Sequence, residues 1–133
     1  MRKSTKYNKV DWTKAPEIKK KVEKLIVDLN ISWVKRKNIH YFKSKNSKAR
    51  AYARIWGLSR IWQIALKKEP HYIIEVLTEN FDKLSEFEKD KVLLHEITHI
   101  PKNFSGSLIP HYKKGKRKFN DLVRELVQKY NKL

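Results

Sequence analysis

The sequence contains no cysteine, which excludes a disulfide framework and any zinc site built on cysteine ligands. It also lacks an apolar run approaching the roughly 18 residues that a transmembrane helix needs. No apolar stretch follows the basic N-terminus, as it would in a signal peptide. We therefore expect an intracellular protein, cytoplasmic or in the host cytoplasm if viral, with no membrane partner.

Acidic residues are scarce. The chain has 133 residues, with 14 Asp and Glu against 32 Lys and Arg, and its formal net charge is +18. Such a charge attracts polyanions, nucleic acid first and anionic lipid second. Because 40% of the residues are hydrophobic and 11% aromatic, the chain can bury a core and form one folded domain.

The basic residues are unevenly distributed. Residues 35–60 contain nine basic and no acidic residues, whereas residues 61–99 contain five basic and eight acidic ones. A chain that only coats nucleic acid has little reason to keep an acidic segment. The candidate chemistry lies inside that segment.

Apolar spacing predicts an α+β domain over residues 15–133, preceded by a basic, flexible arm over residues 1–14. Helices are expected over residues 15–30, 85–100 and 116–132, and strands over residues 31–36, 38–43, 50–56 and 71–77. Residues 61–66 fit either a strand or a helix. We therefore expect an N-terminal helix, a small mixed or antiparallel sheet, a second helix and a C-terminal helix.

The second helix carries the strongest motif. Ser85 and Glu88 form a capping box that starts it, and Pro101 ends it. Within it, His95-Glu96-Ile97-Thr98-His99 is an H-E-x-x-H motif. Spacing i, i+4 places both imidazoles on one helical face, where they can share a zinc ion, and Glu96 can act as general base towards a water.

A catalytic zinc usually has three protein ligands. His111 is the leading candidate for the third, because a loop containing Gly106 and Pro110 can fold it back; Glu125 on the last helix is the alternative. A metzincin would have Gly and His where this chain has Lys102 and Ser105, so that subfamily is excluded. His40 and His71 fit ordinary strand positions.

Tyr112 and the predicted strand over residues 71–77 each allow a functional and a purely structural interpretation. Tyr112, next to His111, is a candidate oxyanion stabiliser or an ordinary packed tyrosine. The strand over residues 71–77 could pair with an extended peptide substrate or be a central strand of the sheet.

The stretch L-L-H-E-I-T-H-I-P-K-N-F-S-G-S-L-I-P-H, Leu93 to His111, resembles the phage and archaeal metallopeptidase family, whose members are small single-domain zincins. The resemblance extends upstream to residues 54–58 and 71–77 and covers about half the chain. It implies a zincin-like fold, zinc on His95, His99 and His111, and Glu96 as catalytic base. SprT-like proteases, which digest proteins attached to DNA, are more distantly similar in the motif helix, size and basic character.

Two functions follow from these features. The first is a zinc-dependent endopeptidase that hydrolyses proteins or peptides and acts near nucleic acid. The second is a basic nucleic-acid-binding protein with structural or absent zinc, in which aromatic side chains stack on unpaired bases. Its candidate aromatics are Tyr41, Phe42, Tyr52 and Trp56. Both functions can coexist, since a basic surface would tether the peptidase close to its substrates. The oligomeric state is not determined by these patterns.

Overall fold

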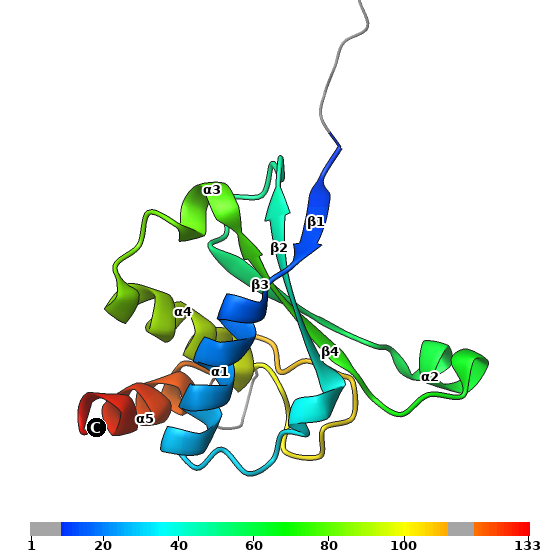
Figure 1. Ribbon diagram of the computed structural model, residues 1–133. Coiled ribbons are helices and arrows are strands. Elements are labelled where there is room, and N and C mark those ends of the chain that lie inside the picture. The colour runs from blue at the N-terminus through cyan, green and yellow to red at the C-terminus, as the bar shows by residue number, and fades with distance from the viewer. Residues whose placement is uncertain (1–8, 112–118) are drawn as a thin grey trace, which may run out of the picture.

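A computed structural model describes residues 9–111 and 119–133. Its elements in chain order are β1 (Asp11–Lys14), α1 (Pro16–Asp28), the 3-10 helix η1 (Arg36–Asn38), β2 (Ile39–Lys45), β3 (Ala53–Gly57), α2 (Arg60–Leu66), β4 (Tyr72–Leu77), α3 (Thr78–Phe81), α4 (Glu86–Thr98) and α5 (Phe119–Asn131). The predicted small α+β domain is confirmed (Figure 1). Of the described helices, none is both long and apolar enough to cross a membrane.

The four strands form one mixed sheet in the order β1-β2-β4-β3. β4 runs parallel to β2 and antiparallel to β3, and β1 pairs antiparallel with the other side of β2. Since β4 is hydrogen-bonded on both sides, it is a central strand with no edge left for a substrate. The prediction that β4 could pair with a peptide was therefore wrong. On the β4 side of the sheet, the outermost strand is β3, and its outer edge is not paired with another described strand.

One face of the sheet packs against α1 and α4 (Figure 1). Tyr72, Ile74 and Val76 alternate along β4 and point into this core, where each is at most 2% exposed. The helices contribute the apolar stripes expected from their spacing, with Val22 in α1 and Ile97 in α4 fully buried. This packing fixes α4, and with it the H-E-x-x-H motif, against the sheet.

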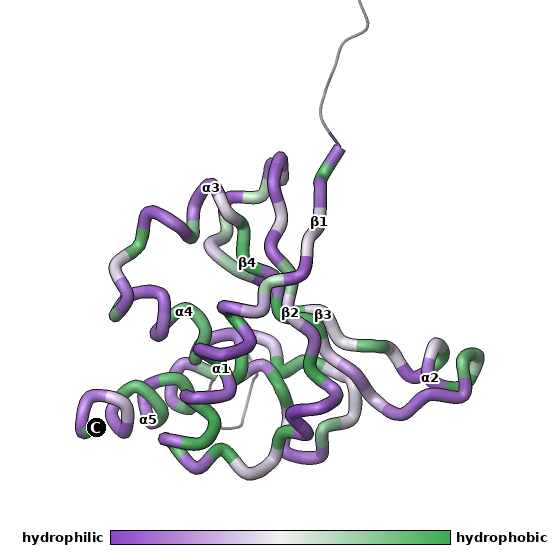
Figure 2. Tube along the Cα trace, viewed as in Figure 1, coloured by the Kyte–Doolittle hydropathy of each residue, from purple (hydrophilic) through white to green (hydrophobic). Residues whose placement is uncertain are grey.

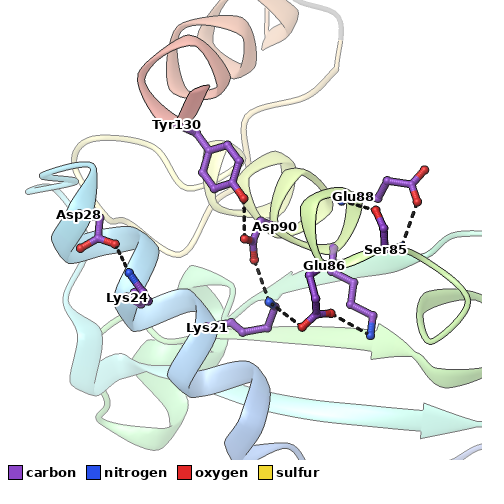
Figure 3. A network of polar contacts seen from close by, with 9 residues as sticks. Lys21, Lys24, Asp28, Ser85, Glu86, Glu88, Asp90 and Tyr130 are labelled. Atoms are coloured by element: carbon purple, nitrogen blue, oxygen red, sulfur yellow. Dashed lines mark hydrogen bonds and ion pairs between the residues drawn. The ribbon is translucent and has the colours of Figure 1, made fainter. Parts of the chain in front are cut away.

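Polar contacts connect the three long helices (Figure 3). Lys21 of α1 lies 3.0 Å from Asp90 of α4, and the Tyr130 hydroxyl of α5 donates a 2.7 Å hydrogen bond to the same carboxylate. The capping box is confirmed, because the Ser85 hydroxyl accepts from the Glu88 N–H and the Glu88 carboxylate accepts from the Ser85 N–H. The start of α4 and its rotation relative to α1 and α5 are thereby fixed.

The end of the predicted flexible arm belongs to the sheet, and residues 1–8 of that arm lie outside the described residues. Residues 11–14, which we assigned to a flexible arm, form β1 and pair with the end of β2 in the register Trp12 to Ser44. The next residue, Ala15, continues this pairing by donating its N–H to the carbonyl of Tyr41. Because the partner strand lies about 30 residues further along the chain, local composition does not reveal the pairing.

The structure corrects the predicted secondary structure of one further segment and decides that of another. Residues 31–36 are not a strand: Asn30 adopts a left-handed backbone, and the Ile31 N–H bonds back to Ile26 of α1. Residues 61–66, whose pattern fits either a strand or a helix, belong to α2. This helix protrudes from the body of the domain (Figure 2). It carries exposed apolar side chains, including Trp62, which is 57% exposed.

Candidate metal centre

The last turn of α4 presents two imidazoles. His95 and His99 are separated by one helical turn, and their ring centroids lie 5.2 Å apart. The opposite side of the helix is anchored by Leu93, Leu94 and Ile97, all fully buried. The anchored side therefore determines the direction in which the two histidines project.

The chain after α4 folds back and brings His111 to the same place. Ile109 donates its N–H to the carbonyl of His99 at 2.8 Å, so this segment runs alongside the end of the helix. Nε2 of His111 then lies 3.1 Å from Nε2 of His95. One ring nitrogen from each of His95, His99 and His111 can be chosen so that all three lie within 4.8 Å of one another.

A hydrogen bond sets the tautomer of His99. Its Nδ1 lies 2.6 Å from the carbonyl oxygen of Ile109. A carbonyl can only accept, so Nδ1–H must donate, and in the neutral ring Nε2 keeps its lone pair. The arrangement is the one by which metal-binding histidines are usually oriented, with the second ring nitrogen bonded to an outer acceptor.

The three rings share an aromatic wall. Phe119, the first residue of α5, is fully buried and stacks on His99 with ring centroids 4.2 Å apart. It also contacts the edges of His95 and His111 at 4.8 and 5.0 Å. The sequence pattern assigned Phe119 only to the apolar stripe of its helix; its place beside the histidines requires the tertiary structure.

Burial favours the neutral form of His95 and His99. Burial, with the nearby rings of His99 and His111, lowers the pKa of His95 to about 4. Burial also lowers the pKa of His99, although the hydrogen bond to Ile109 opposes it. Neutral imidazole is the form that binds metal, and a set of imidazole nitrogens suits a divalent transition metal. The residues present therefore fit such an ion.

Glu96 lines the same cavity as the three histidines and is 6% exposed. Burial raises the pKa of its carboxyl to about 8. A cation held among the imidazoles acts in the opposite direction, because a nearby positive charge favours the carboxylate. The cavity has a volume of about 920 Å³, and apolar side chains from β3, α5 and the loop before His111 form much of its lining.

The loop that carries His111 is anchored to the sheet. The Tyr72 hydroxyl donates to the carbonyl of Ser107 and accepts from the N–H of Gly106, both at 2.8 Å. The Gln63 amide of α2 donates to the carbonyl of Ser105 at 2.9 Å. At Gly57, a Cβ would collide with the carbonyl oxygen of Gly106, so this approach requires glycine. Sequence reasoning missed Tyr72 and Gln63, because neither lies near the motif in the chain.

The remaining candidates lie elsewhere. Glu125, the alternative third ligand, lines a different cavity together with Trp33 and Thr98. His40 and His71 stack on each other at the sheet, with centroids 5.1 Å apart. Tyr112, the candidate oxyanion stabiliser, lies outside the described residues.

The family model described as "Putative phage metallopeptidase" matches residues 10–130, nearly the whole chain. Neither the curated proteins nor the solved structures gave a match.

Proposed function

Because this chain belongs to the phage metallopeptidase family, we propose that it is a zinc-dependent endopeptidase that hydrolyses protein substrates. The observation that carries the proposal is the convergence of His95, His99 and His111 in one cavity with Glu96. We assign the three histidines as zinc ligands and Glu96 as the general base.

A zinc ion held by the three imidazoles would supply Lewis acidity, which makes water a usable nucleophile near neutral pH. The protein contributes the proton transfers. A carboxylate oxygen of Glu96 takes a proton from the attacking water and passes it to the nitrogen of the leaving amine. Phe119 covers one side of the His99 ring, and apolar side chains form much of the lining around these groups.

The edge of β3 supports a binding mode for the substrate. Tyr52 and Leu58 are hydrogen-bonded to β4 at the two ends of the strand pair. The antiparallel pattern alternates, so Ala53 and Ile55 turn their N–H and C=O groups to the outer edge, beside the cavity. We propose that an extended peptide pairs with this edge and is held across Glu96.

Metal analysis and hydrolysis of a denatured, fluorescently labelled protein test this function together. We expect about one zinc per chain, reduced in His111→Ala and retained in His40→Ala, the matched control. Glu96→Gln should keep the zinc and lose hydrolysis by about 10²–10⁴-fold, the usual contribution of a general base.

Three outcomes would contradict the assignments. Zinc fully retained in His111→Ala would place the third ligand elsewhere, with Glu125 the next residue to test. Wild-type hydrolysis by Glu96→Gln would remove the mechanism. Wild-type protein that binds no zinc after reconstitution would leave the basic surface, and the alternative of nucleic-acid binding, as the main lead.

A further inference from the structure

The face of the sheet opposite α1 and α4 has an aromatic surface. Strand alternation and register place Trp12, Phe42, Ile73 and Trp56 on this face, from β1, β2, β4 and β3. Trp12 is 51% exposed and Trp56 is 47% exposed. Together with Glu75 these side chains line a cavity of about 410 Å³. We call this set the aromatic face.

Hydrogen bonds to the buried Glu75 hold the Trp56 side chain of the aromatic face in place. Glu75 of β4 is fully buried, and its carboxylate accepts 2.8 Å hydrogen bonds from Nε of Arg54 and from the indole N–H of Trp56. The Arg54 guanidinium also lies 5.1 Å from the centre of the Trp56 ring. The indole is thus held by its N–H edge, and little side-chain entropy is lost when a ligand contacts it.

The geometry suits a flat aromatic ligand. Phe42 on β2 and Trp56 on β3 lie on either side of β4, and neighbouring strands are about 4.8 Å apart. The two rings therefore stand on strands separated by roughly 10 Å, and Ile73 lies beside Trp56 on the strand between them. An unpaired base can enter this space and stack on a ring, whereas the bases of a duplex are already stacked on one another.

Charge selects the class of ligand. By register, Lys14, His40 and Arg54 share this face, and Glu75 is already paired with Arg54. Lys14 is exposed on this face, whereas Lys43 and Lys45 of β2 alternate onto the opposite face, beside α1. A second copy of the chain would bring its own +18 charge against this surface, so self-association is opposed.

We propose that the aromatic face binds single-stranded nucleic acid, with bases stacked on Trp12, Phe42 and Trp56 and phosphates near Lys14. Of the four aromatic residues that the sequence suggested for stacking on bases, Phe42 and Trp56 belong to this face. Tyr41 is buried on the helix-covered side of the sheet, and Tyr52 borders the cavity of the metal centre. Trp12 contributes instead, because β1 brings it beside β2.

Fluorescence anisotropy with labelled oligothymidylate and full-length protein tests the site. Trp12→Ala and Trp56→Ala should each weaken binding by about 5- to 150-fold, the range for one lost stacking contact. Trp62→Ala on α2, which removes an equally exposed indole outside this face, should bind as wild type. Trp56→Phe keeps an aromatic ring but not the hydrogen bond to Glu75, so it separates stacking from folding and should retain most of the affinity.

The salt dependence gives a second readout. Because a tryptophan contact releases no counterion, both alanine variants should keep the wild-type slope of log affinity against log salt, whereas Lys14→Gln should make it shallower. Wild-type affinity in both tryptophan variants would overturn the site. So would duplex DNA bound as tightly as the single strand, or displacement of the oligonucleotide by polyglutamate at equal charge concentration, which would indicate an acidic protein partner. None of these measurements depends on peptide hydrolysis.

Discussion

The hydroxyl oxygen of Tyr72 accepts a 2.8 Å hydrogen bond from the backbone N–H of Gly106, a residue 34 positions further along the chain. Tyr72 lies in the central strand, and Gly106 lies in the loop between the H-E-x-x-H helix and His111. The same hydroxyl donates to Ser107. The position of the third histidine is therefore coupled to the middle of the sheet by one side chain.

Tyr72→Phe should reduce metal affinity while leaving all three histidines in place. The variant removes both hydrogen bonds and leaves the buried N–H of Gly106 without its acceptor. Loss of a supporting contact around a metal site typically costs 10- to 100-fold in affinity. We expect a change of about that size in a competition titration with a zinc chelator.

Tyr41→Phe is the matched control for that experiment. Tyr41 is also a buried strand tyrosine, but its hydroxyl has no hydrogen-bond partner among the described residues. Removing it should leave zinc affinity unchanged and stability equal or slightly higher, because an unsatisfied buried hydroxyl is lost. Equal zinc affinity in Tyr72→Phe and wild type would show that the hydroxyl does not position His111.

Gly106→Ala should destabilise the fold. Gly106 has φ of +94°, which L side chains rarely adopt, and an added Cβ would collide with the carbonyl oxygen of Leu58. We expect a loss of about 1–3 kcal/mol in the free energy of unfolding, measured with urea. Ser107→Ala, in the same loop but with an exposed side chain, should change it by less than about 0.5 kcal/mol. A fully stable Gly106→Ala would mean that the loop can relax away from Leu58.

Zinc removal should lower the melting temperature of the wild type. A ligand that binds only the folded state stabilises it by about 2.7 kcal/mol at one hundred times its Kd. Chelation should therefore shift the thermal transition in wild type and in His71→Ala, and much less in His95→Ala. A transition that does not respond to zinc in the wild type would show that the ion is not bound by the folded domain.

Acid should weaken the fold through Glu75. Burial alone would raise the pKa of its carboxyl, but hydrogen bonds, first that from Arg54 and then that from Trp56, outweigh burial and place the pKa below its ordinary value. A depressed pKa in the folded state means that the stabilisation is complete above about pH 5 and is lost as the pH falls through the folded-state pKa.

Glu75→Gln tests that linkage. At pH 7 the variant should be less stable by about 1–3 kcal/mol, since charge-assisted hydrogen bonds become neutral ones, and its stability should fall less steeply below pH 5. Asp121→Asn makes the same change in net charge at an exposed site on α5 and should alter stability at pH 7 by less than about 0.5 kcal/mol. An acid slope in Glu75→Gln equal to that of wild type would contradict the assignment.

If both proposed activities are correct, nucleic acid should accelerate hydrolysis of proteins attached to it. A protein crosslinked to oligothymidylate should be cleaved about tenfold faster or more at low salt than the same protein free in solution, because tethering raises its local concentration. High salt and Trp12→Ala should each abolish the difference without changing cleavage of the free protein. Equal rates for the tethered and free protein at every salt concentration would reject the coupling.

The features that could be predicted from the sequence are local ones. The capping box at Ser85 and the i, i+4 spacing of His95 and His99 depend on neighbouring residues in one helix, so the pattern alone defines them. The pairing of β1, the wall formed by Phe119 and the hydrogen bonds of Tyr72 join segments far apart in the chain. Their residue types, a strand tryptophan, a helix phenylalanine and a strand tyrosine, are equally consistent with ordinary packing, so only the tertiary arrangement distinguishes them.

The wall of the three imidazoles comes from α5, which follows all three histidines in the chain. A ribosome makes proteins from the N-terminus onward, so a nascent chain contains His95, His99 and His111 before it contains Phe119. Until α5 has emerged and docked on α4, those rings stand open to water on one side. The order of synthesis therefore leaves the three imidazoles without this aromatic wall until the domain is nearly complete.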